Sequence, residues 1–156
     1  MCLTFDKKPR RIGVIGGEDS SLEIQSLAKD VGKEIAKRGF ILISGGLKGV
    51  MESACSGAKE AGGITIGILP DKNTSSANPF VDIPIVTGIG YARNMIVVLS
   101  SEVIIAIGGR HGTLSEIAYG LTFKIPIIGL STWDIEGIIP AKTPEEAVSQ
   151  AASFLK

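Results

Sequence analysis

The chain has 156 residues, of which 44% are hydrophobic and only 5% aromatic, a composition that suits one domain with an aliphatic core. Its 16 basic residues balance its 16 acidic ones, and this zero formal net charge disfavours general nucleic-acid binding. Cys2 and Cys55 show no metal-ligand spacing and no disulfide framework, and no apolar run is long enough to span a bilayer. We therefore expect a soluble cytoplasmic protein with one domain over residues 1–156, of which 1–10 form a loose N-terminal segment.

The strands predicted by the sequence are short, largely β-branched runs that end at glycines or other turn-forming residues. They cover residues 11–17, 40–44, 64–69, 83–86, 102–107 and 126–130. Because each run is continuously apolar rather than alternating, we expect strands that are buried on both faces of a parallel sheet.

Helix signals separate these runs. Ser20-Ser21-Leu22-Glu23 fits a capping box for a helix that ends at Gly39, and Thr143 followed by Pro144 starts a last helix through Phe154. Further helices are expected over residues 50–61, 91–100 and 114–123. The small residues of the 50–61 helix predict a close approach to the sheet, whereas the stretch 131–141 gives no clear prediction.

Strands and helices alternate along the whole chain. This order predicts an α/β fold: a doubly wound, mostly parallel sheet with helices on both faces (Rossmann-like), in a single domain. In such a sheet, ligands bind beyond the carboxyl ends of the strands, where the strand order reverses.

Glycine-rich turns follow three of the predicted strands, at Gly16-Gly17, Gly45-Gly46 and Gly108-Gly109. All three therefore lie at the carboxyl edge of the sheet, where a backbone without Cβ atoms can approach a ligand closely. The third turn continues through Arg110, His111, Gly112 and Thr113 into a helix whose first N–H groups favour an oxyanion. One such turn is as often structural as functional, but three together predict a cleft for a small anionic ligand.

Common phosphate-binding and catalytic motifs are missing. No G-x-G-x-x-G opens the first helix, and Lys48 is followed by Gly49 rather than by the ending of a P-loop, which disfavours a standard NAD site and a standard NTPase. Lys48 either meets an anion or faces solvent. His111 has no evident Asp or Ser partner, so it gives weak support for a catalytic base.

Three further side chains near the turns each have two interpretations. Glu116 lies three residues after Thr113, so it either completes a capping box or faces the cleft and accepts hydrogen bonds from a ligand. Arg93 either pairs with phosphate in a bidentate fork or lies on the surface. Asn94 either donates to the ligand or caps the turn.

Three ordered segments resemble a known group of proteins. Residues 44–51 (SGGLKGVM) resemble the G-G-x-x-G-[LV]-M segment of the Lonely-guy-like superfamily, which has long carried a lysine decarboxylase label. Residues 92–94 (ARN) resemble its arginine-bearing helix start, and residues 108–116 its P-G-G-x-G-T-x-x-E signature. The resemblance extends from Ile12 to Leu130. It implies a homo-oligomer, a dimer or tetramer, for which the aliphatic helix at 95–99 is a candidate interface.

The sequence departs from the phosphoribohydrolase branch of that superfamily at three positions. Gly108 stands where the signature has proline, Arg110 where it has the second glycine, and Asn94 where lysine is common. These residues resemble more closely a sister branch that is related to DNA-processing protein A and includes molybdenum-cofactor carrier proteins.

The resemblance implies two competing functions. The carrier branch implies binding of a nucleotide-like or phosphorylated ligand, including the molybdenum cofactor. The enzyme branch implies that Arg93 and Glu116 cleave the N-glycosidic bond of a nucleoside 5′-monophosphate while Gly109, Gly112 and Thr113 hold its phosphate. Lysine decarboxylation is disfavoured because no lysine lies in a cofactor-linking context. The residues leave open whether the chain is an enzyme.

The expected ligand-binding residues are those of the glycine turns and of the helix starts beside them: Gly16, Gly17, Gly45, Gly46, Lys48, Gly49, Arg93, Asn94, Gly108, Gly109, Arg110, His111, Gly112, Thr113 and Glu116. The bound species expected are a nucleotide, phosphate or the molybdenum cofactor. We expect no metal site, no required cofactor and no membrane or nucleic-acid partner.

Overall fold

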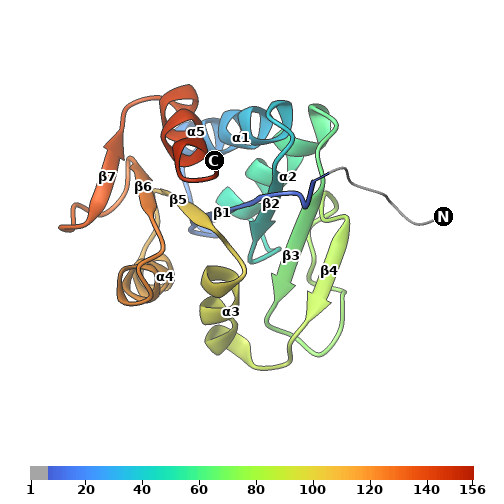
Figure 1. The fold of residues 1–156 in the computed structure, drawn as a ribbon. Coiled ribbons are helices and arrows are strands. Elements are labelled where there is room, and N and C mark those ends of the chain that lie inside the picture. The colour runs from blue at the N-terminus through green and yellow to red at the C-terminus, as the bar shows by residue number, and fades with distance from the viewer. Residues whose placement is uncertain (1–6) are drawn as a thin grey trace.

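The computed structural model describes residues 7–156; Cys2 and most of the segment expected to be loose lie outside the described residues. The elements, in chain order, are β1 (Arg11–Gly16), α1 (Leu22–Lys37), β2 (Ile41–Ser44), α2 (Val50–Glu60), β3 (Thr65–Leu69), β4 (Ile83–Val86), the 3-10 turn η1 (Gly90–Arg93), α3 (Asn94–Leu99), β5 (Val103–Ile107), α4 (His111–Thr122), β6 (Ile127–Leu130), β7 (Ile138–Ala141) and α5 (Pro144–Ser153). The strands form one seven-stranded sheet in the order β4-β3-β2-β1-β5-β6-β7, with every neighbouring pair parallel (Figure 1). The predicted doubly wound α/β fold is confirmed.

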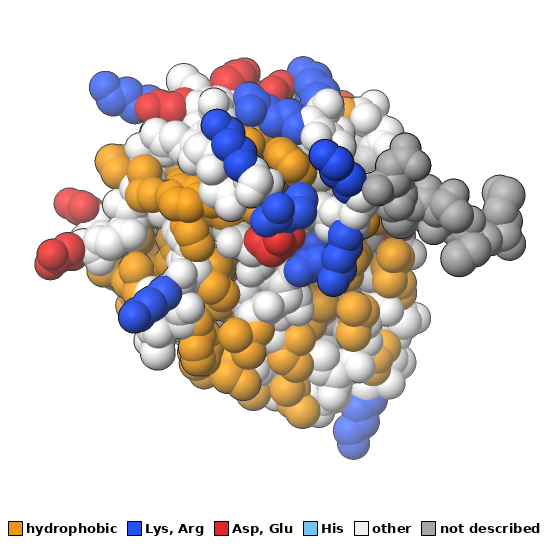
Figure 2. Space-filling model, in the orientation of Figure 1, with side chains coloured by type: hydrophobic (Ala, Val, Ile, Leu, Met, Phe, Trp, Pro, Cys, Tyr) orange, Lys and Arg blue, Asp and Glu red, His pale blue; other side chains and the backbone are white. Residues whose placement is uncertain are grey.

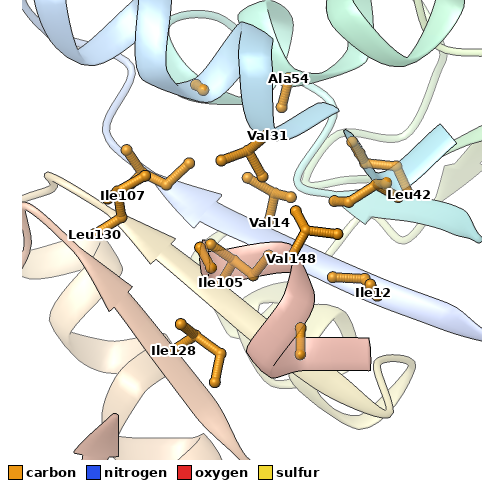
Figure 3. Close-up of a cluster of buried hydrophobic side chains, with 14 of the residues drawn as sticks. Ile12, Val14, Val31, Leu42, Ala54, Ile105, Ile107, Ile128, Leu130 and Val148 are labelled. Atoms are coloured by element: carbon orange, nitrogen blue, oxygen red, sulfur yellow. The ribbon is translucent and has the colours of Figure 1, made fainter. Parts of the chain in front are cut away.

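Helices cover both faces of this sheet. α1, α2 and α5 pack on one face, where Val31, Ala54 and Val148 meet aliphatic side chains such as Val14 and Ile105 from the strands (Figure 3). α3 and α4 lie on the opposite face, below the sheet in Figure 1, over a second cluster of buried aliphatic residues. The continuously apolar strand runs of the sequence are explained by this double coverage.

Small residues of α2 allow close packing on two sides. Ala54 and Ala58 lie in the core cluster with strand residues, as expected for a helix close to the sheet. A Cβ atom placed on Gly57 would lie 1.9 Å from the backbone oxygen of Lys29, and one on Gly32 would lie 1.9 Å from that of Ala54. The small residues of α2 therefore also allow a close approach to α1, which the sequence did not predict.

Two local predictions also change. The N-cap of α1 is Ser21, whose hydroxyl accepts a hydrogen bond from the Ile24 N–H at 3.3 Å. The predicted capping box of Ser20 and Glu23 is therefore wrong, because the third helical position is occupied by Ile24. β7 lies inside the stretch that gave no clear prediction. It is short and pairs only with β6, so it is an edge strand. It contains Pro140, and proline within sheets is found mainly in edge strands.

The sheet has one topological switch point. β1 pairs with β2 on one side and with β5 on the other, and the connections from these central strands lead toward opposite edges of the sheet. This geometry places the ends of β1 and β5 together at the carboxyl edge. Among the described residues, no helix has the length and apolar character needed to cross a membrane.

Candidate functional site

A cavity of about 220 Å³ lies at the switch point. Its walls come from the end of β1 and the following loop, from the turn after β2, from η1, and from the first turns of α4. The lining residues are Val14, Ile15, Gly16, Gly17, Glu18, Asp19, Gly45, Met51, Tyr91, Arg93, Asn94, Arg110, Gly112, Thr113 and Glu116. The cavity thus occupies the place where parallel α/β sheets bind ligands.

The turn between β5 and α4 needs glycine for steric reasons. Gly109 has a φ of +99°, and a Cβ atom there would lie 2.3 Å from Oγ1 of Thr113. The backbone of this turn also lies against the first glycine turn, since a Cβ on Gly17 would be 3.7 Å from the Gly109 Cα. Two of the predicted glycine turns are therefore in contact.

The N-terminus of α4 forms one wall of the cavity. The helix begins at His111. The Leu114 N–H donates a hydrogen bond to the carbonyl of the N-cap residue, Arg110, at 2.9 Å. No side chain caps this end. The N–H groups before Leu114 have no intrahelical acceptor, and with the helix dipole they favour an anion.

The predicted capping box at this helix is wrong. Arg110, not Thr113, is the N-cap residue, so Thr113 occupies the third helical position and Glu116 lies one turn further along. Both side chains line the cavity instead, with exposed fractions of 2% and 8%. Of the two interpretations of Glu116, the structure supports the one in which it faces the cleft.

Arg93 is buried and held by backbone acceptors. Its Nε donates to the Ile68 carbonyl at 2.8 Å, one Nη donates to the Gly45 carbonyl at 3.4 Å, and the other donates to Oδ1 of Asn94. Asn94 in turn donates to the Ser115 hydroxyl at 3.1 Å. This network links η1, the turn after β2 and the start of α4, and it fixes the guanidinium in the cavity wall.

Glu116 has no hydrogen bond or ion pair with any of residues 7–156. Burial raises the pKa of its carboxyl group to about 8, although the positive charge of Arg93 acts in the opposite direction. The Thr113 hydroxyl is likewise buried without a partner within the described part of the chain. Buried polar groups without partners are rare in folded proteins, and the Thr113 hydroxyl beside the unpaired Glu116 carboxyl group indicates a place where a ligand supplies the missing bonds.

The rim of the cavity is exposed. Arg110 and Asp19 form an ion pair at 3.7 Å across the mouth, with side chains that are 80% and 91% exposed. Tyr91 is 86% exposed and also borders the opening. The site therefore has a solvated, charged rim and a buried inner wall.

The structure brings together most but not all of the residues predicted to bind a ligand. Nine of them line the cavity: Gly16, Gly17, Gly45, Arg93, Asn94, Arg110, Gly112, Thr113 and Glu116. The six that do not are Gly46, Lys48, Gly49, Gly108, Gly109 and His111. Lys48 and His111 are exposed to solvent. Gly49 instead allows close packing, since a Cβ there would lie 2.3 Å from the Gly17 carbonyl oxygen.

Sequence reasoning missed six lining residues: Val14, Ile15, Glu18, Asp19, Met51 and Tyr91. Glu18 and Asp19 directly follow the first glycine turn, so their position at the carboxyl edge of the sheet was an available signal. Met51 lies in the first turn of α2 and Tyr91 belongs to η1, and only the three-dimensional packing places these two at the cavity.

The loop between β6 and β7 supports the turn between β5 and α4. The Thr132 hydroxyl donates to the Gly108 carbonyl at 2.6 Å, and Nε1 of Trp133 donates to the Arg110 carbonyl at 3.3 Å. These bonds hold the turn from the side away from α1. Nothing in the sequence of this stretch indicated such contacts.

The chain matches one protein family and has relatives of known sequence. The model of the SLOG cluster4 family matches residues 9–154. A relative from Archaeoglobus fulgidus with no assigned function is 44% identical over 153 residues, which cover 94% of this chain and 97% of the relative. A cytokinin riboside 5′-monophosphate phosphoribohydrolase from Mycobacterium tuberculosis is 32% identical over 120 residues, which cover 71% of this chain and 64% of the enzyme.

Solved structures show the same fold. The molybdenum cofactor binding protein from Rippkaea orientalis superposes with a TM-score of 0.91 at 41% identity, covering 96% of this chain and 99% of that protein. The molybdenum cofactor carrier protein from Chlamydomonas reinhardtii superposes with a TM-score of 0.86 at 42% identity, covering 95% and 99%. These similarities confirm the resemblance drawn from the three sequence segments.

Proposed function

The chain belongs to the SLOG cluster4 family, and from this premise we propose that it binds the molybdenum cofactor in the cleft at the switch point. That ligand combines a flat pterin ring with a phosphorylated, negatively charged arm. The observation that carries the proposal is the cavity wall formed by α4, where free helix N–H groups lie beside the unpartnered Thr113 hydroxyl and Glu116 carboxyl group. The likeness to two proteins described as binding or carrying this cofactor supports it.

The residues of the cleft fit such a ligand. The N–H groups at the start of α4 and the guanidinium of Arg93 suit the anionic arm. The inner wall contains Ile15, Met51 and Gly45, which offer apolar surface and room for a flat ring. A Cβ on Gly45 would lie 2.8 Å from both the Met51 sulfur and Nη2 of Arg93, so glycine keeps this wall open.

Retention of the cofactor tests the proposal directly. Purified protein is incubated anaerobically with molybdenum cofactor released from a molybdoenzyme and then separated by gel filtration. The denatured protein fraction is examined by mass spectrometry and by fluorescence of the oxidised pterin. We expect one pterin for each chain, and a protein fraction without pterin would contradict the proposal.

A conservative variant of the cavity wall makes the test specific. Thr113→Val keeps the shape of a buried side chain and removes a hydroxyl that has no partner, so the fold should be unaffected while cofactor retention falls. Thr122→Val is the matched control, because this threonine lies at the far end of the same helix and bonds only to the Ala118 carbonyl. Equal loss in both variants would show that the effect is not local to the cleft.

A second candidate is hydrolysis of nucleoside 5′-monophosphates. The observation in its favour is that Arg93 and Glu116, the two residues implied by the enzyme branch, are both buried in the wall of one cavity. A carboxylate beside the ribose would stabilise an oxocarbenium-like transition state and orient water. Incubation with AMP tests this candidate: release of adenine that is lost in Glu116→Ala would favour the hydrolase over a carrier.

We also propose that the chain forms a homo-oligomer through one apolar face. On the side of the sheet that bears α3, Ile83 and Ile85 of β4 are 48% and 42% exposed, and Met95 and Leu99 of α3 are 38% and 54% exposed. Figure 2 shows hydrophobic side chains gathered over the region of α3 and β4. A contiguous apolar patch of this kind is typical of a protein interface.

Light scattering after gel filtration tests the oligomer. The wild type should elute as a dimer or tetramer at micromolar concentration, and the double substitution Ile85→Lys and Leu99→Lys should yield monomers. Monomeric wild-type protein would contradict this part of the proposal without affecting ligand binding.

A further inference from the structure

The carboxyl group of Glu116 is the polar group of the cleft that most needs a ligand. It is 8% exposed, lines the cavity from the second turn of α4, and makes no hydrogen bond or ion pair with residues 7–156. Leaving a buried carboxyl group without partners is unfavourable unless a bound molecule supplies them. Once ionised, this carboxyl group only accepts hydrogen bonds, so a molecule that binds the carboxylate must carry donors at this depth.

Arg93 does not fill that role, although it lies in the same wall. Its guanidinium already donates to the carbonyls of Ile68 and Gly45 and to the side chain of Asn94. It holds the wall in place and contributes a positive charge nearby. The donors for Glu116 therefore have to come from the ligand.

The order of groups along α4 defines the shape of that ligand. Arg110 at the rim and Glu116 inside are six residues apart, which corresponds to about 9 Å along a helix axis. Arg110 and the first helical turn favour negative charge, whereas Glu116 at the inner end favours hydrogen-bond donors. The lining also contains the acidic side chains of Glu18 and Asp19, and Asp19 pairs with Arg110. The cleft thus suits an elongated molecule, anionic at its outer end and rich in N–H donors at its inner end.

We propose that Glu116 determines specificity by recognising the 2-amino group and the adjacent ring N–H of a pterin, which together donate two parallel hydrogen bonds to one carboxylate. This inference rests on the proposed cofactor binding and names the part of the ligand that is buried. A fused two-ring heterocycle with a phosphorylated arm has the length needed to reach from Glu116 to the rim at Arg110. Paired hydrogen bonds to an ionised carboxylate are stronger and more selective than neutral ones.

The geometry also predicts which related molecules bind poorly. A lumazine carries a carbonyl oxygen in place of the 2-amino group, so one donor becomes an acceptor that faces the carboxylate. A site built to accept from two donors discriminates strongly against a molecule that lacks one of them, because a buried polar group is left unpaired. A simple oxyanion such as phosphate can bind near Arg110 and the start of α4 but offers no donors to Glu116, so it should bind weakly.

The test compares 6-carboxypterin with 6-carboxylumazine, two anionic, fluorescent probes that differ at this one group. Affinities for the full-length protein are measured by fluorescence titration and by calorimetry. We expect the wild type to bind the pterin at least roughly tenfold more tightly than the lumazine, as the loss of one charge-assisted bond predicts. In Glu116→Gln the affinity for the pterin should fall, whereas the affinity for the lumazine should not fall, because the amide N–H can donate to the carbonyl oxygen that faced the carboxylate.

Controls separate this inference from the function on which it rests. Glu145→Gln makes the same chemical change at an exposed position on α5, outside the cleft, and should leave both affinities unchanged. Equal affinity for the two probes in the wild type, with no change in Glu116→Gln, would overturn the inference and leave cofactor binding standing. Retention of the molybdenum cofactor that is as strong in Glu116→Gln as in the wild type would also overturn it.

Two further outcomes have defined meanings. If AMP binds more tightly than the pterin and loses affinity in Glu116→Gln, then the carboxylate recognises ribose hydroxyls, and the inference is wrong. If neither probe nor the cofactor binds, the proposed function fails and the inference fails with it.

Discussion

Carboxyl groups have opposite environments at the two edges of the sheet. At the amino edge, Glu102 accepts hydrogen bonds from Nε of Arg10 at 2.7 Å and from the Arg11 N–H at 2.8 Å. Burial alone would raise the pKa of Glu102, but these donors hold it below its ordinary value. At the carboxyl edge, Glu116 lacks such donors, and burial raises its pKa to about 8.

A second amino-edge carboxylate repeats the first pattern. Asp82 precedes β4 and accepts from Nζ of Lys59 at 2.8 Å and from the Thr65 N–H at 3.0 Å. Partial desolvation acts to raise the pKa of Asp82, but these bonds lower it below its ordinary value, although the side chain is 35% exposed. Carboxylates at the amino edge thus link the starts of neighbouring strands, whereas Glu116 at the carboxyl edge is kept unpaired at a cost in stability. Such a cost is expected at functional sites.

The largest predicted effect concerns the stability cost of Glu116. Because its pKa is raised from 4.5 to about 8 in the folded state, the folded protein binds a proton more tightly than the unfolded chain does. Stability should therefore fall as pH rises from about 5 to about 8 and level off above, by about 3–5 kcal/mol at about 1.4 kcal/mol per pKa unit. Glu116→Gln should abolish this slope, as urea unfolding at several pH values would reveal.

Glu145→Gln provides the matched control for that measurement, since it makes the same change on an exposed side chain. The control should retain the wild-type slope. A wild-type free energy of unfolding that does not change between about pH 5 and pH 8 would show that Glu116 finds a partner in the folded protein.

The amino edge should respond in the reverse direction. Glu102→Gln removes the acceptor of two charge-assisted bonds, and the free energy of unfolding at pH 7 should fall by about 1–2 kcal/mol, since Glu102 is partly solvated. The folded-state pKa of Glu102 lies below 4.5, so its contribution is complete above the unfolded value and is lost as pH falls through the folded value. The difference between variant and wild type, measured by urea unfolding, should shrink in acid. A difference that grows in acid would contradict this assignment.

Ligand binding should couple to the proton on Glu116. The carboxyl group must ionise to accept two hydrogen bonds, so the affinity for 6-carboxypterin should increase by roughly twentyfold between about pH 6 and pH 7.5, and not in Glu116→Gln. The charged or titratable side chains that border the cavity are Glu18, Asp19, Tyr91, Arg93 and Arg110. Calorimetry in two buffers of different ionisation enthalpy should show proton release on binding, and uptake would contradict the prediction.

The contrast between the edges also explains what the sequence could and could not predict. The strands, the order of helices and the glycine turns follow from local patterns, and the parallel topology then places every strand end at one edge. Arg93, Thr113 and Glu116 could be selected because they flank those turns. Local patterns therefore identified the inner wall of the cleft.

The remainder depends on packing between distant segments. Met51 and Tyr91 reach the cavity only through the placement of α2 and η1, and the support from Thr132 and Trp133 comes from a loop with no sequence signal. The capping-box pattern at Thr113 failed because the N-cap of α4 is Arg110, three residues earlier, which turns Glu116 from a cap into a cavity residue. The observed start carries no capping-box residues, so a search for that motif selects the wrong start.

The smallest predicted effect lies at the rim, where the carboxyl edge meets solvent. Arg110 and Asp19 are 80% and 91% exposed and 3.7 Å apart, so their ion pair is screened and should contribute nothing measurable to stability. Arg110→Gln should leave the unfolding transition unchanged and weaken binding of 6-carboxypterin by only about two- to threefold in dilute buffer. This loss should vanish at about 0.5 M salt, because long-range attraction of the anionic arm is screened there. A loss that persists in salt would instead place Arg110 in direct contact with the ligand. In that case the exposed rim would also recognise the ligand, and recognition would not be confined to the buried inner wall.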